Sequence, residues 1–149
     1  MRVAALGLDV GKKRIGVAGC DGTGLIATGL RTIRWRSFQQ VLQELRELID
    51  ERQVQILVVG LPYNMDGSLG PQARHVQKFA DTISGVFQLP VEYVDERLTS
   101  FQAEQLIIAE GRSLMQNKEL IDRKAASLIL QQWLDERRSG KRKTPLTEC

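Results

Sequence analysis

The sequence is poor in cysteine and in long apolar runs, and each shortage excludes a class of protein. Its 149 residues include two cysteines, Cys20 and Cys149, which form neither a disulfide framework nor a thiolate metal site by their spacing. No apolar run is long enough to span a membrane, and Arg2 followed by a short apolar stretch does not resemble a signal peptide. We therefore expect a cytoplasmic protein without a membrane partner.

The sequence also lacks a common nucleotide-binding motif and a large positive charge. The phosphate-binding motif GxxxxGK[ST] is missing, which argues against a P-loop nucleotidase. The net charge of +3 is too small to establish a nucleic-acid partner by itself. Basic residues do gather locally, because Lys12, Lys13 and Arg14 are consecutive and residues 137–143 carry five cations. Both groups could equally be solvated surface.

The composition is that of one ordinary globular domain. Hydrophobic residues make up 42% of the chain and charged residues 26%, and the length is sufficient for a full core. The chain contains no internal repeat and no linker before Ser139. We expect residues 1–138 to form the domain and residues 139–149 to form a basic, disordered tail.

Hydrophobic periodicity and turn residues predict the order β-β-β-α-β-α-β-α-α. Strands are expected at residues 3–10, 13–20, 25–33, 54–59 and 91–94, with a hairpin turn at residues 21–24. Helices are expected at residues 37–52 with Ser37 as N-cap, around residues 76–83 with an end near Gly85, from Thr99 to Gly111, and at residues 118–138. This order predicts an α/β fold with a five-stranded mixed sheet, strand order 3-2-1-4-5, and helices on both faces.

Three carboxylates stand at the ends of predicted elements. Asp9 lies in the first strand among apolar neighbours, Glu96 follows the fifth strand, and Asp122 interrupts an apolar face of the last helix. Each has an ordinary explanation taken alone. Asp9 could pair with Lys12 or Arg14, Glu96 could be a surface charge, and Asp122 could favour the positive end of its helix.

Together the three acids indicate a metal site, since grouped carboxylates repel one another unless cations stand between them. Oxygen ligands without histidine or cysteine suit Mg²⁺ or Mn²⁺, and a two-metal site of this kind performs phosphoryl transfer. One difficulty is distance, because the first and fifth strands are roughly 9–10 Å apart at about 4.8 Å per step. Glu96 must lean inward to share a metal with Asp9. The loop after the fourth strand offers Asn64 and Asp66 instead.

Four motifs carry a resemblance to a known family. In order they are GLDVGKKRIGVA, GLPYNMDGS, VDERLTS and IDRKAASLIL, and the resemblance that they carry extends over residues 3–133. This set resembles the YqgF family of RNase H-like nucleases, which are akin to RuvC-like Holliday junction resolvases. The resemblance implies an RNase H-type sheet and a nuclease that matures the 5′ end of pre-16S rRNA, with junction resolution as an alternative.

The resemblance assigns catalysis and metal binding to Asp9, Glu96 and Asp122. Nucleases of this fold often use four carboxylates, so Asp95 or Asp66 could complete the set. The expected cofactor is Mg²⁺ or Mn²⁺, in a two-metal site.

Substrate binding is expected from basic and polar residues near these acids. Arg97 could hold the scissile phosphate or pair with Asp95. The candidates for backbone and substrate contacts are Lys12, Lys13, Arg14, Asn64 and Arg97. The expected partner is nucleic acid, with structured RNA preferred and branched DNA as the alternative, and precursor ribosomal particles are a further expected partner.

Three other side chains receive structural interpretations. His75 is expected on the flank of the second helix, Tyr63 in loop packing although it could stack on a base, and Trp133 in the core stripe of the last helix.

Two other functions compete with the nuclease. The DxG hairpin resembles the phosphate loop of actin-like ATPases and sugar kinases, but 149 residues leave no room for their second lobe. A non-catalytic RNA- or ribosome-binding module is the other alternative, since fold alone does not prove function. The chain could be a monomer or a homodimer, and junction cleavage would require a symmetric dimer.

Overall fold

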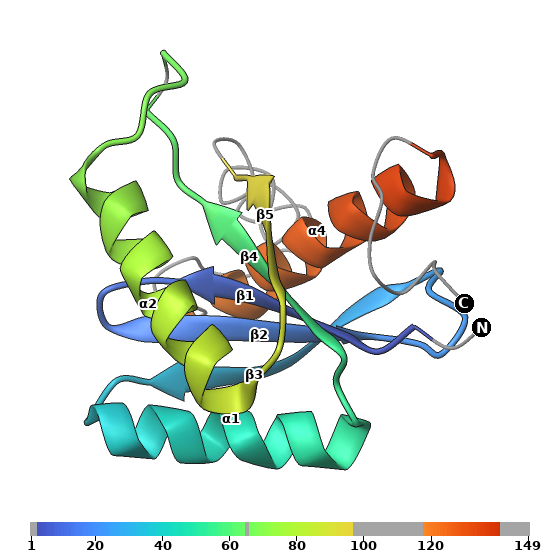
Figure 1. Ribbon diagram of the computed structural model, residues 1–149, viewed down its shortest axis with the longest axis horizontal. Helices are drawn as coiled ribbons and strands as arrows, with labels where there is room; N and C mark the ends of the chain where they lie inside the picture. The colour runs from blue at the N-terminus through green and yellow to red at the C-terminus, as the bar shows by residue number, and fades with distance from the viewer. Residues whose placement is uncertain (1–2, 65, 97–117, 141–149) are drawn as a thin grey trace.

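A five-stranded mixed sheet in the order β3-β2-β1-β4-β5 forms the centre of the computed structural model, which describes residues 3–64, 66–96 and 118–140 (Figure 1). The strands are β1 (Ala5–Val10), β2 (Arg14–Cys20), β3 (Ala27–Arg34), β4 (Ile56–Leu61) and β5 (Val91–Asp95). The helices within these residues are α1 (Phe38–Arg52), α2 (Pro71–Phe87) and α4 (Lys118–Arg138). The helix predicted from Thr99 to Gly111 and residues 141–149 of the predicted tail lie outside the described residues.

The predicted strand order is confirmed. β1 pairs antiparallel with β2 and β2 with β3, whereas β1 with β4 and β4 with β5 are parallel. The carboxyl ends of β1, β4 and β5 therefore meet at one end of the sheet, where ligand sites of open α/β sheets form.

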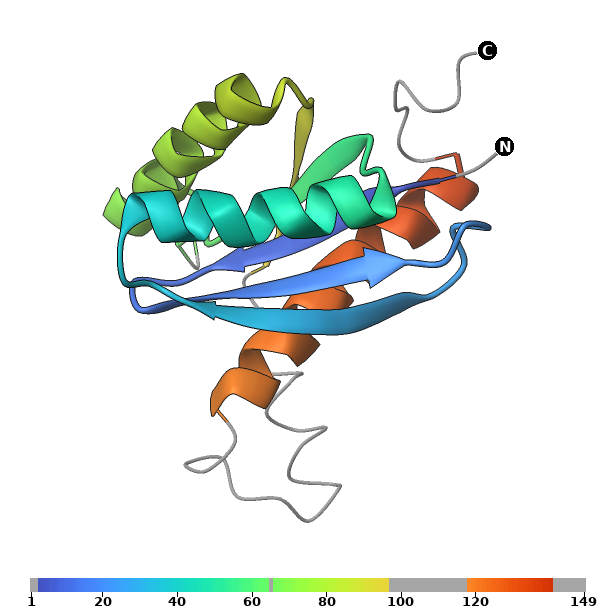
Figure 2. The same cartoon turned by 90° about the horizontal axis from the view of Figure 1, so that it is seen from below.

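Helices cover both faces of the sheet, as predicted. Figure 2 shows α1 and α2 on one face and α4 on the other. Strand alternation sends Leu6, Leu8 and Val10 of β1 into the core beneath α1 and α2. The intervening residues of β1 point to the α4 face, where Ala5 joins the second core cluster. Asp9 therefore does not interrupt the core formed by its sequence neighbours.

The observed helix ends differ from the predicted ones mainly in α2. Ser37 caps α1 as expected, with its hydroxyl accepting a hydrogen bond from the Gln40 backbone amide. The prediction that the second helix closes near Gly85 is wrong, because the helix continues to Phe87 and ends at Gln88 in a left-handed conformation. β4 likewise extends past Gly60 to Leu61.

Small residues let α4 lie close to the sheet. Ala125, Ala126 and Trp133 are fully buried, which confirms the predicted core stripe. A Cβ at Gly7 of β1 would come within 2.8 Å of Leu130 Cβ, so the glycine permits this approach. At the start of α4, the Thr32 hydroxyl donates a hydrogen bond of 2.7 Å to the Glu119 carbonyl.

In the part of the chain that the structure describes, no helix is both long and apolar enough to cross a membrane.

Candidate active site

Asp9 lies near the end of β1 between two glycines on the neighbouring strands. Gly16 of β2 is its direct partner in the antiparallel register. On the other side, the parallel register pairs Leu8 with Val59, so the next position of β4 is Gly60. Both neighbours lack side chains, which leaves space around the Asp9 carboxylate on the α4 face.

Glu96 reaches Asp9 across Gly60. The Glu96 amide donates a hydrogen bond of 3.2 Å to the Leu61 carbonyl, which continues the β4–β5 pairing by one residue. A Cβ at Gly60 would lie 2.7 Å from Glu96 Oε2 and 3.0 Å from its carboxyl carbon. The Glu96 side chain therefore occupies the volume that a side chain at position 60 would fill. By passing over Gly60 in this way, Glu96 spans the distance from β5 to β1.

The two carboxyl groups form a coupled pair. The hydrogen bond between the two carboxyl groups lowers the pKa of Asp9 and raises the pKa of Glu96, so Glu96 is the group that favours the proton. Desolvation, reinforced by the charge of Asp9, raises the pKa of Glu96 to about 9. Desolvation also raises the pKa of Asp9 to about 6, although the hydrogen bond from Glu96 works in the opposite direction. The pair therefore shares a proton at neutral pH.

Asp122 stands beside this pair but is held by Arg14. Arg14 Nε lies 2.6 Å from Asp122 Oδ2 in a partly buried ion pair between β2 and α4. Desolvation raises the pKa of Asp122 despite the stabilising contact with Arg14. The charge of Asp122 also raises the pKa of Asp9, which places the third acid within electrostatic reach of the pair.

The donor set of the pair fits a divalent cation. Glu96 Oε2 is buried and has no hydrogen-bond partner among the described residues. This oxygen is therefore available to bind a ligand. Mg²⁺ and Mn²⁺ bind through such oxygens. Within residues 3–64, 66–96 and 118–140, however, no three acidic, histidine or cysteine side chains lie close enough to hold a metal together. The structure thus brings Asp9 and Glu96 together and leaves Asp122 engaged with Arg14.

The other predicted acidic ligands point elsewhere. Asp66 Oδ1 accepts hydrogen bonds from the amide and hydroxyl of Ser68, at 2.9 and 2.6 Å, within its own loop. Asn64 also bonds Ser68, at 3.0 Å. Asp95 alternates with Val94, which packs beneath α4, so strand geometry directs Asp95 to the opposite face. Asp66 is thus hydrogen-bonded within its own loop, whereas the charge of Asp95 raises the pKa of Glu96 and so lies within electrostatic reach of the pair.

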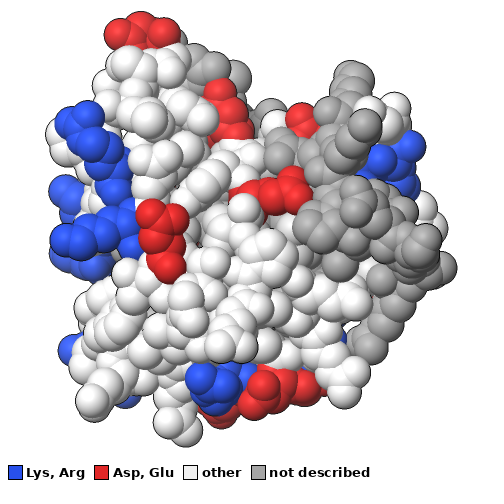
Figure 3. Space-filling view, viewed as in Figure 1, with Lys and Arg blue, Asp and Glu red and all other residues white. Residues whose placement is uncertain are grey.

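The predicted basic residues divide into two groups. Lys12 and Lys13 are exposed in the turn that follows β1, a few residues beyond Asp9. Figure 3 shows Lys and Arg side chains gathered on the edge of the molecule where this turn lies, at the left of the view. Arg14 turns inward to Asp122, as described above. Arg97 lies outside the described residues.

The sequence interpretation missed the two glycines that shape the site. Gly16 admits the backbone of α4, because a Cβ there would lie 2.0 Å from the Asp122 carbonyl oxygen. Gly60 admits the Glu96 carboxylate. The available signal was a glycine within each otherwise apolar strand, which often marks a close approach of another group.

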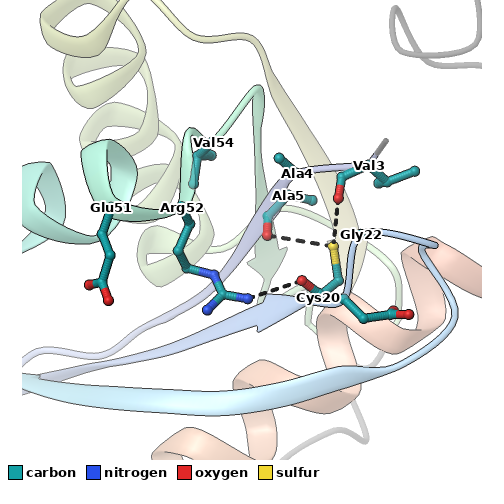
Figure 4. Close-up of a pocket in the computed structure, with 9 residues that line it drawn as sticks. Val3, Ala4, Ala5, Cys20, Gly22, Glu51, Arg52 and Val54 are labelled. Atoms are coloured by element: carbon teal, nitrogen blue, oxygen red, sulfur yellow. Dashed lines mark hydrogen bonds between the residues drawn. The ribbon is translucent and has the colours of Figure 1, made fainter. Parts of the chain in front are cut away.

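A cavity lies at the opposite end of the sheet from the acidic pair. It has a volume of about 290 Å³ and is bordered by Cys20, Arg52 and neighbouring residues (Figure 4). Two hydrogen bonds link residues of its lining: the Cys20 thiol donates to the Val3 carbonyl at 3.5 Å, and Arg52 donates to the Cys20 carbonyl at 3.0 Å. These hydrogen bonds indicate that the polar groups of Cys20 and Arg52 have a structural role here.

The strand order, the helix arrangement and the acids at the sheet end define the RNase H-like class, the fold of the junction resolvases. The fold resembles RuvC of T. thermophilus in complex with Holliday junction substrate, with a TM-score of 0.56 at 16% identity over 93% of this chain and 96% of that chain. It also resembles the Fowlpox virus resolvase bound to Holliday junction DNA, with a TM-score of 0.56 at 13% identity over 91% of this chain and 99% of that chain. The chain belongs to the RuvX family, also called YqgF, whose model is described as "Holliday junction resolvase" and matches residues 3–136.

Curated relatives are far more similar in sequence. A protein of Trichormus variabilis is 67% identical over 138 residues, which cover 93% of this chain and 91% of the relative. A protein of Rippkaea orientalis is 65% identical over 137 residues, covering 92% and 99%. A protein of Crocosphaera subtropica is 62% identical over 139 residues, covering 93% and 97%. Each carries the name "Putative pre-16S rRNA nuclease".

Proposed function

We propose that this protein is a metal-dependent nuclease that hydrolyses phosphodiester bonds of precursor 16S rRNA during ribosome assembly in the cytoplasm. The observation that carries the proposal is the Asp9–Glu96 pair at the carboxyl end of the central strands, in which a buried carboxyl oxygen has no hydrogen-bond partner among the described residues. The names of relatives that are 62–67% identical support the substrate.

In this proposal Asp9 and a deprotonated Glu96 would hold Mg²⁺ or Mn²⁺. A cation held there would supply positive charge for activating a water and for stabilising the charge that develops on the phosphate. Gly60 keeps Glu96 directed at Asp9. Asp122 would join as a third ligand by releasing Arg14, whose guanidinium would then be free to contact a phosphate.

The basic turn would guide the substrate towards the acids. Lys12 and Lys13 are exposed beside Asp9, where they can contact the backbone phosphates without reading sequence. We also retain Asn64 and Arg97 as candidates for substrate contacts, Asn64 from the loop between β4 and α2.

The test compares wild type with Asp9→Asn on three end-labelled substrates in Mg²⁺ or Mn²⁺. These are a precursor 16S rRNA fragment, a four-way DNA junction and an unstructured single-stranded RNA. We expect metal-dependent cleavage of the rRNA fragment that Asp9→Asn abolishes while nucleic-acid binding is retained. Equal cleavage by the folded variant would refute the role of Asp9. Equal binding without cleavage by either protein would instead indicate a non-catalytic RNA-binding module.

Junction resolution is the second candidate, because the matching family model is described as a Holliday junction resolvase. Cutting two strands together requires a symmetric dimer, whereas trimming of rRNA requires one site. Cleavage of the four-way junction together with a dimeric mass in light scattering would favour this candidate.

A further inference from the structure

A surface pocket of about 720 Å³ lies beside the proposed catalytic end of the sheet. It is lined by Gly11, Lys12, Trp35, Pro71, Gln72 and His75, and is called the Trp35 pocket below. These residues come from the turn after β1, the segment after β3 and the first residues of α2, which Figure 1 shows together at the left of the molecule. Gly11 lies two positions beyond Asp9, or about 7 Å along an extended chain.

Trp35 presents a fixed aromatic surface to this pocket. Its indole ring packs against Phe79 of α2 at 5.6 Å and against Phe38 of α1 at 6.3 Å between ring centroids. Its backbone amide donates a hydrogen bond of 2.9 Å to the Lys13 carbonyl, which joins it to the basic turn. The residue is nevertheless 36% exposed. A held but exposed aromatic ring can stack on a flat ligand with little loss of conformational entropy.

The rest of the lining indicates which flat ligand fits. Lys12 supplies a cation from the turn after β1, and His75 supplies an imidazole ring from α2. An aromatic face next to a cation matches a nucleotide, since the base stacks and its phosphate pairs with the lysine. None of the described residues that line the pocket is a carboxylate, so an anionic ligand meets no repulsion from them.

We propose that the Trp35 pocket binds one unpaired nucleotide of the substrate strand, with its base stacked on Trp35 and its phosphate on Lys12. A base within a duplex is stacked on both sides and cannot enter a pocket of this kind, so the site selects single-stranded or flipped-out nucleotides. The proposal rests on the nuclease function proposed above.

The position of the pocket specifies the path of the strand. Asp9 points to the α4 face of the sheet, whereas the Trp35 pocket opens beside α2 on the other face. A strand that occupies both sites must cross the turn after β1, where Lys12 and Lys13 are exposed. The nucleotide in the pocket is therefore a near neighbour of the phosphate that is cut.

Tryptophan fluorescence tests the proposal directly. The chain has two tryptophans, and Trp133 is fully buried, so Trp35 alone should respond to a stacked base. We would titrate a short unstructured oligoadenosine RNA into the protein with a chelator present, which excludes cleavage. The expected result is quenching of Trp35 emission at the same concentration at which fluorescence anisotropy of labelled RNA reports binding.

The variants separate stacking from structure. Trp35→Phe should abolish the quenching and retain most of the affinity, whereas Trp35→Ala should weaken binding by about 5- to 150-fold. Lys12→Gln, at an exposed position, should weaken binding and reduce its salt dependence. Ile26→Ala is the control, because Ile26 is also an exposed apolar residue but lies in the β2–β3 connection away from the pocket.

The outcomes distinguish this proposal from the nuclease function. Unchanged affinity in Trp35→Ala and no quenching, together with cleavage that depends on Asp9, would overturn the nucleotide pocket and leave the nuclease intact. Equal affinity for a blunt RNA duplex and for the single strand would also overturn it. Failure to bind or cleave any nucleic acid would overturn both proposals.

Discussion

Glu96 and Gly60 are in direct contact across two neighbouring strands, and a Cβ at Gly60 would lie 2.7 Å from Glu96 Oε2. The glycine thus creates the path along which a residue at the end of β5 meets Asp9 on β1. Glu96, in turn, has a carboxyl group whose pKa is raised to about 9 and a buried oxygen without a partner among the described residues. Burying two carboxyl groups side by side is electrostatically unfavourable, and such arrangements are common at sites that act on a ligand.

Gly60→Ala should reduce nuclease activity strongly. The methyl group would displace the Glu96 carboxylate, and a misplacement of about 1 Å in a catalytic group can lower the rate about 100-fold. It would also approach Ile129 Cδ1 to 2.4 Å, so we expect the free energy of unfolding to fall by about 1–3 kcal/mol. Gly85→Ala is the control, because a Cβ there meets nothing within 4 Å. Full activity in folded Gly60→Ala would show that the position of Glu96 is not critical.

Stability without metal should decrease as the pH rises. The pKa values of Asp9 and Glu96 are raised from 3.8 to about 6 and from 4.5 to about 9, so the folded chain retains protons that the unfolded chain has lost. The contribution of the pair to the free energy of unfolding is therefore fully present at pH values below the ordinary pKa values of the two groups. It falls as the pH rises towards their raised pKa values, by up to about 1.4 kcal/mol per pH unit for each group. Denaturant titrations in chelator at several pH values measure this slope.

Glu96→Gln should flatten that pH dependence and stabilise the metal-free protein at pH 8. The amide removes the titrating group and can still donate a hydrogen bond to Asp9. Glu51→Gln, at an exposed position on α1, provides a control for the loss of one negative charge. If both variants keep the wild-type slope, the pair is not the source of the pH dependence.

Binding of Mg²⁺ or Mn²⁺ should release protons and become tighter as the pH rises, because the cation replaces the proton that Asp9 and Glu96 share. Titration calorimetry in two buffers of different ionisation enthalpy measures the number of protons released. Asp9→Asn should abolish the signal. Heats that do not depend on the buffer would mean that the cation binds elsewhere.

Arg14→Gln should lower the free energy of unfolding by about 1–3 kcal/mol, because it leaves Asp122 partly buried without its ionic partner. Asp122→Asn in the same chain should recover much of this loss, since the uncompensated charge is then gone. A double-mutant cycle of the two positions measures the coupling. Additive effects would show that the contact of 2.6 Å contributes little to stability.

Gly16→Ala should affect folding more than any other glycine substitution considered above. A Cβ at this position would lie 2.0 Å from the Asp122 carbonyl oxygen, and the backbone of α4 cannot yield as a side chain can. We expect a loss of about 3 kcal/mol or more, measured by denaturant titration. A loss below that of Gly60→Ala would show that α4 can shift away from β2.

The sheet order could be predicted from the sequence because its signals are local. Hairpin residues fix the neighbours of β2, and the change from period two to helical period marks α1 and α2. The same patterns place Asp9 and Glu96 at strand ends, so a site at this end of the sheet was predictable. The end of α2 was not, because Gln88 adopts a left-handed conformation that is usual for glycine, and Gly85 is tolerated within the helix.

The partners of the three acids depend on the tertiary structure. Sequence patterns place Asp9, Glu96 and Asp122 near one another, but they do not reveal that Glu96 pairs with Asp9 while Asp122 pairs with Arg14. Those contacts arise from the strand register and from how closely α4 approaches β2. Composition and periodicity carry information about which face a residue occupies, whereas side-chain contacts between distant segments are set by packing of the whole molecule.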